Sequence, residues 1–219
     1  MFAGITTMNF ENSEDELEGF YSREGEYVSF SEKVVISEHP AIYDWLTKIE
    51  SSMQTSLAHK LDASVSSLDI LDRNEQQEEF NDWIKFYPAM IVILAMQVSW
   101  SHRVEDSLEQ KQGKNLPIAE DSIRLTLEML AERVLTDLPK AIRKKYEQLI
   151  TDLVHQRVVT NQMITEKVSK PSEFKWLYHM RFYWNPKKSD PLEKLIIQMA
   201  NGNFFYGFEY LGVGEKLVQ

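Results

Sequence analysis

The sequence lacks cysteine altogether, and this absence excludes disulfide bonds, thiolate metal sites and cysteine nucleophiles. It also lacks an apolar run of the roughly 18 residues that a helix needs to cross a bilayer. The longest such stretch, Met90 to Val98, is interrupted by Gln97. The amino terminus has neither the basic start nor the apolar core of a secretory signal. These absences predict a cytoplasmic protein without membrane contacts.

Motifs that carry chemistry are also missing. The string Gly212-Val213-Gly214-Glu215-Lys216 is close to a phosphate-binding loop. Such a loop needs glycine before its lysine and serine or threonine after it, whereas Glu215 and Leu217 stand there. No serine lies in a Gly-x-Ser-x-Gly elbow, and no two histidines have metal-ligand spacing. We therefore expect no catalytic residue, no metal site and no cofactor of its own in this chain.

Two kinds of side chain remain candidates for a function or for the core. His155 adjoins the apolar stripe of a predicted long helix, with Arg157 two residues further on. We favour a buried or half-buried histidine that is hydrogen-bonded inside a bundle over an active role. The tryptophans are spread through the chain, which indicates core anchors rather than a platform for stacking bases; they are Trp45, Trp83, Trp100, Trp176 and Trp184.

Charge is distributed unevenly along the chain. The net charge is −10, with 18 acidic and 5 basic residues in 1–82 but 8 acidic and 13 basic residues in 140–219. An acidic chain argues against nucleic-acid binding. The basic carboxy-terminal part is either a solvated helical face, which is the more common case, or a surface that docks on an acidic partner.

Apolar periodicity predicts four long helices and hence a helical bundle. A stripe of apolar residues at spacings of three and four runs from Ile42 to Leu61, and 62–79 is expected to be a polar loop or a weak helix start. Pro88 precedes a helix from Ala89 to about Leu108 whose first half is apolar nearly all round, as in the middle of a bundle. Two further helices are expected over 118–138 and from about 142 to 168.

Strands are expected at both ends of the chain. Apolar or aromatic stretches at 5–10, 17–21 and 27–36 are separated by acidic turns. Near the other end, Asn201-Gly202 lies between two β-prone runs and predicts a hairpin with a type I′ turn. The sequence thus predicts a mainly α protein with short strands in 1–38, a helical bundle in 39–172 and an antiparallel meander in 173–219.

The aromatic residues of the carboxy-terminal part stand in an order that resembles the dynein heavy chain family. The strings that carry the resemblance are Phe174-Lys175-Trp176-Leu177, Met180-Arg181-Phe182-Tyr183-Trp184, Gln198-Met199-Ala200-Asn201, Phe205-Tyr206-Gly207-Phe208-Glu209-Tyr210-Leu211-Gly212 and Lys216-Leu217-Val218. They are similar to the last part of the linker, just before the first AAA+ module, and closer to cytoplasmic than to axonemal dyneins. The resemblance extends upstream through Glu24-Gly25-Glu26, Trp83 and Trp100. Val154-His155-Gln156-Arg157 resembles a family motif in which an aspartate usually stands at the place of Val158.

This resemblance implies a segment of a motor that moves toward microtubule minus ends. The segment would be the ring-proximal part of a helical lever, driven by ATP and Mg²⁺ in the adjoining AAA+ module, with that ring, microtubules and dynein accessory chains as partners. Leu217 and Val218 would lie on the adenine side of the nucleotide in the whole motor. Two other interpretations stay open: a helical scaffold that binds a protein partner without a motor role, and an enzyme without a recognisable motif.

Overall fold

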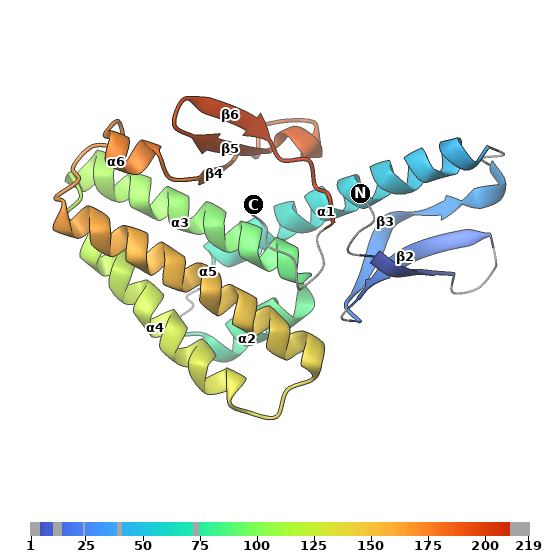
Figure 1. Ribbon diagram of the computed structural model, residues 1–219, viewed down its shortest axis with the longest axis horizontal. Helices are drawn as coiled ribbons and strands as arrows, with labels where there is room; N and C mark the ends of the chain where they lie inside the picture. Colours follow the sequence, from blue (N-terminus) through green and yellow to red (C-terminus); the bar gives the residue numbers. More distant parts are fainter. Residues whose placement is uncertain (1–4, 11–14, 24, 39–40, 72–74, 211–219) are drawn as a thin grey trace.

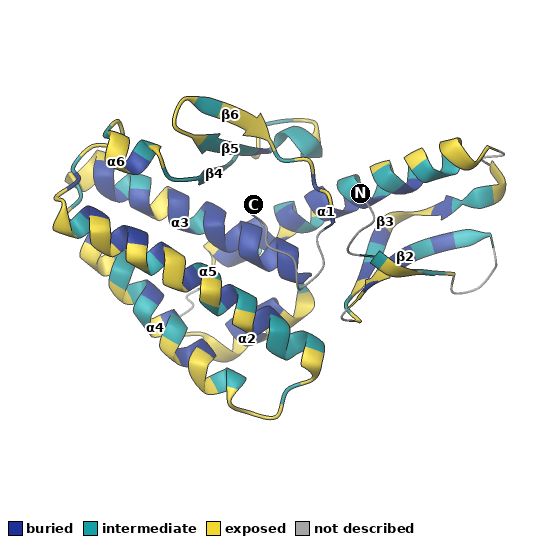
Figure 2. Cartoon of the chain, viewed as in Figure 1, coloured by how far each residue is buried: buried dark blue, intermediate teal, exposed yellow. Residues whose placement is uncertain are grey.

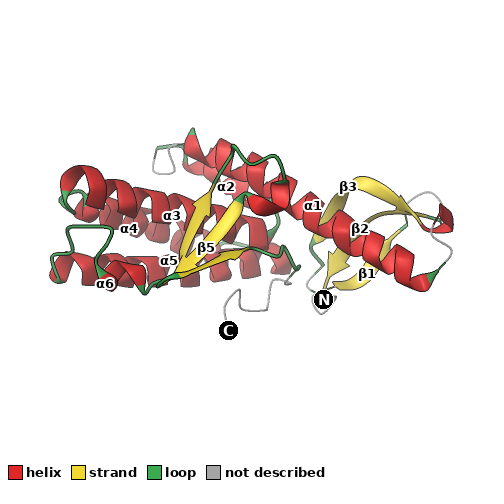
Figure 3. Cartoon of the chain, turned by 90° about the horizontal axis from the view of Figure 1, so that it is seen from above, coloured by secondary structure: helices red, strands yellow, loops and turns green. Residues whose placement is uncertain are grey.

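The computed structural model describes residues 5–10, 15–23, 25–38, 41–71 and 75–210. Within these ranges the chain is mainly helical and has two three-stranded antiparallel sheets, one near each end of the sequence. The predicted fold class is confirmed. The molecule is elongated, with a helical bundle at one end, the amino-terminal sheet at the other, and one long helix reaching from the sheet into the bundle (Figures 1 and 3).

The amino-terminal sheet has the order β1-β2-β3, and its strands are β1 (Ile5–Asn9), β2 (Glu16–Ser22) and β3 (Tyr27–Val35). A short 3₁₀ helix, η1 (Ile36–Glu38), follows. Gly25 takes a positive φ of 87° in the turn between β2 and β3, where the Ser22 N–H donates to the Glu26 carbonyl at 2.8 Å. The predicted strands and the turn between the last two are confirmed.

Helix α1 (Ile42–Asp69) packs on β3 and then continues into the bundle, against the third helix. Its extent differs from the prediction, which ended the apolar stripe near Leu61 and expected a polar loop or a weak helix start over 62–79. The stripe in fact continues through Val65 and Leu68, which are buried. The buried Ser64 hydroxyl donates to the Leu61 carbonyl at 2.9 Å, so a polar side chain is accommodated inside the helix.

Four further helices complete the bundle: α2 (Gln77–Phe86), α3 (Ala89–Lys111), α4 (Leu116–Val134) and α5 (Lys140–Thr165). Together with α1, the last three are the four long helices that the periodicity predicted, whereas α2 was not predicted as a helix. Residues 89–98 of α3 are buried on every side, as expected, and Figure 2 shows this segment as an almost continuous buried stretch.

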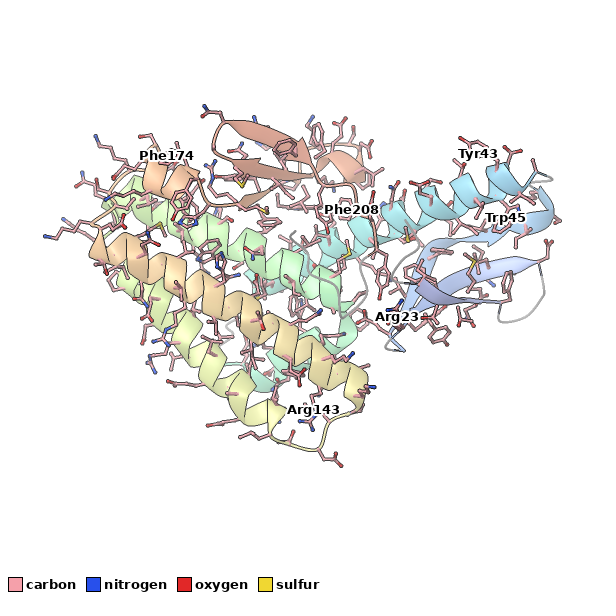
Figure 4. All side chains as sticks on the ribbon, in the orientation of Figure 1. Arg23, Tyr43, Trp45, Arg143, Phe174 and Phe208 are labelled. Carbon is pink, nitrogen blue, oxygen red and sulfur yellow. The ribbon has the colours of Figure 1, made fainter. Side chains whose placement is uncertain are left out.

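Helices α4 and α5 both end earlier than predicted. Helix α4 stops at Val134 because the Arg143 guanidinium, at the α4–α5 turn in Figure 4, donates to the carbonyls of Val134 (2.6 Å) and Thr136 (3.0 Å). Helix α5 stops at Thr165 because Lys167 takes a positive φ of 53°.

The turn between α3 and α4 depends on a glycine. Gly113 has a φ of +78°, and a Cβ atom at this position would lie 2.3 Å from the Val168 carbonyl oxygen. Only glycine combines this backbone conformation with such a close approach. The segment just after α5 therefore packs directly on the α3–α4 turn.

The carboxy-terminal part begins with α6 (Phe174–Leu177) and forms the sheet β4-β5-β6, whose strands are β4 (Arg181–Trp184), β5 (Leu195–Met199) and β6 (Gly202–Phe205). The 3₁₀ helix η2 (Pro191–Glu193) precedes β5. The hairpin was predicted correctly, but its turn is one residue earlier than predicted: Met199 pairs with Gly202, so the turn residues are Ala200 and Asn201. Ala200 takes the positive φ of 51°, because its N–H donates to the Leu177 carbonyl at 2.7 Å and so fixes the turn against α6.

Candidate functional site: two joints between the sheets and the bundle

The residues that the resemblance assigned to the nucleotide, Leu217 and Val218, lie outside the described residues, as does the glycine-rich string at 212–216. His39 lies outside them too. In the part of the chain that the structure describes, no three His, Asp or Glu side chains are placed to hold a metal ion.

The interpretation of His155 as a buried histidine was wrong. His155 lies on the exposed face of α5, whose inward positions are taken by Leu153, Gln156 and Val159. The predicted role of the tryptophans is confirmed: Trp83, Trp100 and Trp176 are buried, while Trp45 and Trp184 are half-buried against the core.

A hollow of about 680 Å³ lies between the end of α1, the carboxy-terminal half of α3 and the start of α4. Its described lining includes the polar residues Arg103, Asp106 and Ser107 together with Ile70 and Ile118. The described lining holds two serines, Ser107 and Ser122, and no histidine, so it offers no serine–imidazole pair.

Helix α3 instead carries the first of two polar joints, which we call the sheet joint: Ser101, Glu105, Trp176, Phe182 and Tyr183. The Phe182 N–H donates to the Ser101 hydroxyl at 3.0 Å, so the free edge of β4 is hydrogen-bonded to a helix instead of another strand. One oxygen of Glu105 accepts hydrogen bonds from the Trp176 indole (3.0 Å) and from the Tyr183 hydroxyl.

The sheet joint is buried at Ser101, Trp176 and Phe182 and half-buried at Glu105 and Tyr183, and it extends to α5. Trp176 packs edge-on against Trp100 with ring centroids 5.4 Å apart, and the Trp100 indole donates to the Thr160 hydroxyl of α5 at 3.1 Å. Burial, followed by the hydrogen bond to Glu105, raises the pKa of the Tyr183 hydroxyl. Tyr183 therefore stays a neutral hydrogen-bond donor at physiological pH.

A second contact fixes the sheet to α1. The Lys194 ammonium, just before β5, lies 2.8 Å from a carboxylate oxygen of Asp62 and 5.7 Å from the centre of the Trp184 ring. The carboxy-terminal sheet is thus attached to both α3 and α1. Figure 1 shows it lying over α3 and beside the inner end of α1.

The second joint, which we call the Glu26 junction, gathers four segments that are distant in sequence: Glu26, Ala89, Lys145 and Tyr210. One Glu26 oxygen accepts from the Ala89 N–H at 3.0 Å and pairs with the Lys145 ammonium at 3.1 Å. The other accepts from the Tyr210 hydroxyl at 3.1 Å. The turn after β2, the start of α3, helix α5 and the segment after β6 therefore meet at one carboxylate.

The ion pair of the Glu26 junction is almost fully withdrawn from solvent. The side chains of Lys145 and Glu26 are 5% and 9% exposed. Lys145 also donates to the Tyr87 carbonyl, at the end of α2, at 2.7 Å. A buried pair with these additional hydrogen bonds is costly to break, because removing either partner leaves an uncompensated charge, typically at a cost of about 3–5 kcal/mol.

A third polar group lies between α3 and α5. The Asp152 carboxylate accepts from the Gln156 amide at 2.7 Å and from the Gln97 amide. No cation pairs with it among the contacts of the described residues, so burial raises the pKa of the Asp152 carboxyl to about 7.

The sequence did not single out Lys145, Glu105 or Asp152. Each lies on a helix among many other charged residues, and each has a partner that is far away in sequence: Glu26 for Lys145, Trp176 for Glu105 and Gln97 for Asp152. Glu26 was noted as part of a predicted turn, and both Glu26 and Tyr210 were noted within the strings that resemble dynein heavy chains. One available signal was that Lys145 directly precedes the apolar position Tyr146, on a helix face that turns inward.

None of the helices in the described ranges is both long and apolar enough to cross a membrane. Residues 1–64 match the family "Dynein heavy chain, N-terminal region 2". The whole chain is similar to the cytoplasmic dynein heavy chains of Paramecium tetraurelia (44% identity over 224 residues), Dictyostelium discoideum (39% over 226) and Drosophila melanogaster (39% over 224).

The matches cover 100% of this chain but only 5% of each of these relatives, so the chain spans about a twentieth of their length. The name that they share places them in the cytoplasm, in agreement with the location predicted from the sequence. Similarity over the complete chain to several heavy chains from distant organisms is specific to one family. Over its whole length the chain is therefore similar to cytoplasmic dynein heavy chains, and its first 64 residues match a dynein heavy chain family region.

Proposed function

We propose that this chain is the ring-proximal part of a dynein linker, the lever that couples ATP hydrolysis in an AAA+ ring to minus-end-directed movement on microtubules. In this proposal the chain performs no catalysis of its own. ATP and Mg²⁺ bind in the adjoining AAA+ module, and Leu217 and Val218 lie on the adenine side of that nucleotide. The partners of the whole motor are its own ring, microtubules and the dynein accessory chains.

The observation that carries the proposal is the attachment of the carboxy-terminal sheet to the bundle. A lever must pass force from one end to the other without yielding in between. The sheet is hydrogen-bonded to α3 through the sheet joint and ion-paired to α1 through Asp62 and Lys194. Helix α1 in turn packs on the amino-terminal sheet. Close-packed contacts of this kind transmit displacement rather than absorb it.

The test is to loosen the sheet joint in a complete heavy chain. Ser101→Ala leaves the buried Phe182 N–H without an acceptor, which costs about 1–3 kcal/mol locally, and Tyr183→Phe removes a donor to Glu105. Microtubule gliding by the double variant should slow, while ATP hydrolysis without microtubules is retained. The matched control is Tyr43→Phe, at an exposed position near the far tip of α1 (Figure 4).

Unchanged gliding in a variant whose sheet joint is shown to be loosened would argue against the lever. A tight complex between a protein partner and this chain, with gliding unaffected, would instead favour the scaffold interpretation.

A further inference from the structure

The α2–α3 corner lacks the usual local caps. Pro88 precedes α3 and its side chain forms no hydrogen bond to the first turn of the helix. The first N–H groups of a helix have no partner inside the helix and carry a partial positive charge. Glu26 supplies the missing acceptor from the turn after β2, 63 residues away in sequence, through its 3.0 Å contact with the Ala89 N–H.

The opposite side of the same corner is held by Lys145. The last carbonyls of α2 lack partners inside the helix and carry a partial negative charge. The Lys145 ammonium donates to the Tyr87 carbonyl at 2.7 Å. The two charges thus hold the end of α2 and the start of α3 in one arrangement, and they neutralise each other at 3.1 Å.

Tyr210 attaches the segment after β6 to this corner. Its side chain is 1% exposed, its ring packs edge-on against Phe20 of β2 with centroids 4.7 Å apart, and its hydroxyl donates to Glu26. The neighbouring Phe208, labelled in Figure 4, is fully buried. Tyr210 thus contacts β2 and the turn after it directly, and it is linked to α3 and α5 of the bundle through Glu26.

We infer that Glu26 is the positioning residue that fixes the path of the segment after β6 relative to both the amino-terminal sheet and the bundle. Its two oxygens have separate tasks: one caps α3 and pairs with Lys145, and the other holds Tyr210. A displacement of Tyr210 therefore disturbs the cap of α3 and the turn after β2 together. In the proposed lever, on which only this last step rests, the junction holds the end of the described chain at Tyr210 against the amino-terminal sheet and the bundle.

Tyr210→Phe tests the inference with the smallest change. It keeps the ring on Phe20 and removes only the hydroxyl that binds Glu26. Amide hydrogen exchange, followed by NMR on the 219-residue chain, should accelerate by roughly ten- to hundredfold at Tyr206, whose N–H donates to the Leu195 carbonyl at 3.1 Å. A smaller acceleration is expected at Glu26, whose N–H donates to the Ser22 hydroxyl.

Exchange at Leu153, in the core of α5, should stay unchanged and marks global stability. Tyr43→Phe is the matched control, because it removes the same hydroxyl from an exposed ring. Equal acceleration at Leu153, Tyr206 and Glu26 would mean that Tyr210 contributes only to overall stability. No acceleration of exchange at Tyr206 would mean that the Tyr210 hydroxyl does not hold the segment after β6 in place. Either result overturns the inference.

Glu26→Asp provides an independent variant. It keeps the charge for Lys145 but shortens the side chain by one methylene, so it cannot reach Ala89 and Tyr210 together with the same backbone. Faster exchange at both Ala89 and Tyr206 is expected, again with Leu153 unchanged. Slow exchange at both positions would contradict the positioning role. These measurements involve no motor activity, so they stand apart from the gliding test of the lever.

Discussion

Asp152 shows how one carboxyl can make the bundle sensitive to pH. Its pKa is about 7 in the folded chain and close to its usual 3.8 in the unfolded chain. Between these values the folded state holds the proton and the unfolded state does not, so the free energy of unfolding falls as the pH rises from about 4 to about 7. Above that window the penalty is complete, because the charged form is then buried without a cation.

Asp152→Asn should remove this penalty. The amide can still accept a hydrogen bond from Gln97 or Gln156, and it carries no charge at any pH. The variant should gain about 2–4 kcal/mol over the parent chain at pH 8 and little or nothing at pH 4. Urea unfolding followed by circular dichroism between pH 4 and 8 measures this difference, with the exposed Asp137→Asn as the control.

If the free energies of unfolding of the parent chain and of Asp152→Asn changed in parallel with pH, this account of Asp152 would be contradicted. The comparison with Asp137→Asn removes the contribution of net charge, since both variants lose one negative charge. What remains is the effect of burial.

At the scale of elements, the α3–α4 turn is the point at which a single methyl group should matter most. Gly113→Ala would place a Cβ atom 2.3 Å from the Val168 carbonyl oxygen at a φ of +78°. The variant should lose roughly 2–4 kcal/mol of unfolding free energy, since both the backbone strain and the clash oppose it. Thermal and urea unfolding measure the loss.

Gly207→Ala is the matched comparison, because no atom lies within 4 Å of the corresponding Cβ position. Its effect should stay within roughly 0.5 kcal/mol. Equal destabilisation by both changes would show that the close contact between the α3–α4 turn and Val168 is not formed in solution.

The helices with clear apolar periodicity and the hairpin were predicted correctly. The residues at which two of these helices end, and the exact turn of the hairpin, were not. Apolar periodicity identified α1, α3, α4 and α5, because a helix that buries one face must repeat its apolar residues every three to four positions. The ends of α4 and α5 depend on Arg143 and Lys167, whose effects arise from tertiary contacts and a single backbone conformation. The hairpin turn was placed one residue late because the contact of Ala200 with Leu177 outweighs the local preference of Asn-Gly.

Apart from the position of Lys145 directly before Tyr146, local patterns give no indication of the joints. Glu26, Lys145 and Tyr210 each look like ordinary turn, helix or strand-end residues, and only the packing of four distant segments brings them together. His155 shows the converse error, since a position next to an apolar stripe can face either way when the helix phase is uncertain by one residue.

At the scale of the whole molecule, the proposal that ATP binds in the adjoining AAA+ module predicts weak nucleotide binding by this chain alone. The sequence has no complete phosphate-binding loop, so the triphosphate would have no cradle of backbone N–H groups in this chain. We expect ATP to bind no more tightly than about millimolar, which corresponds to roughly 4 kcal/mol of binding free energy. Isothermal titration calorimetry with Mg·ATP measures this, and micromolar binding would contradict the proposal.

The edge-on contact between Trp100 and Trp176 gives the sheet joint a built-in optical signal. Both indoles are buried, and each N–H has a fixed polar partner, Thr160 for one and Glu105 for the other. Separation of the sheet from α3 would admit water to this pair, and indole emission shifts to longer wavelength in water. The integrity of the joint can thus be followed by intrinsic fluorescence, without a label and while a load is applied.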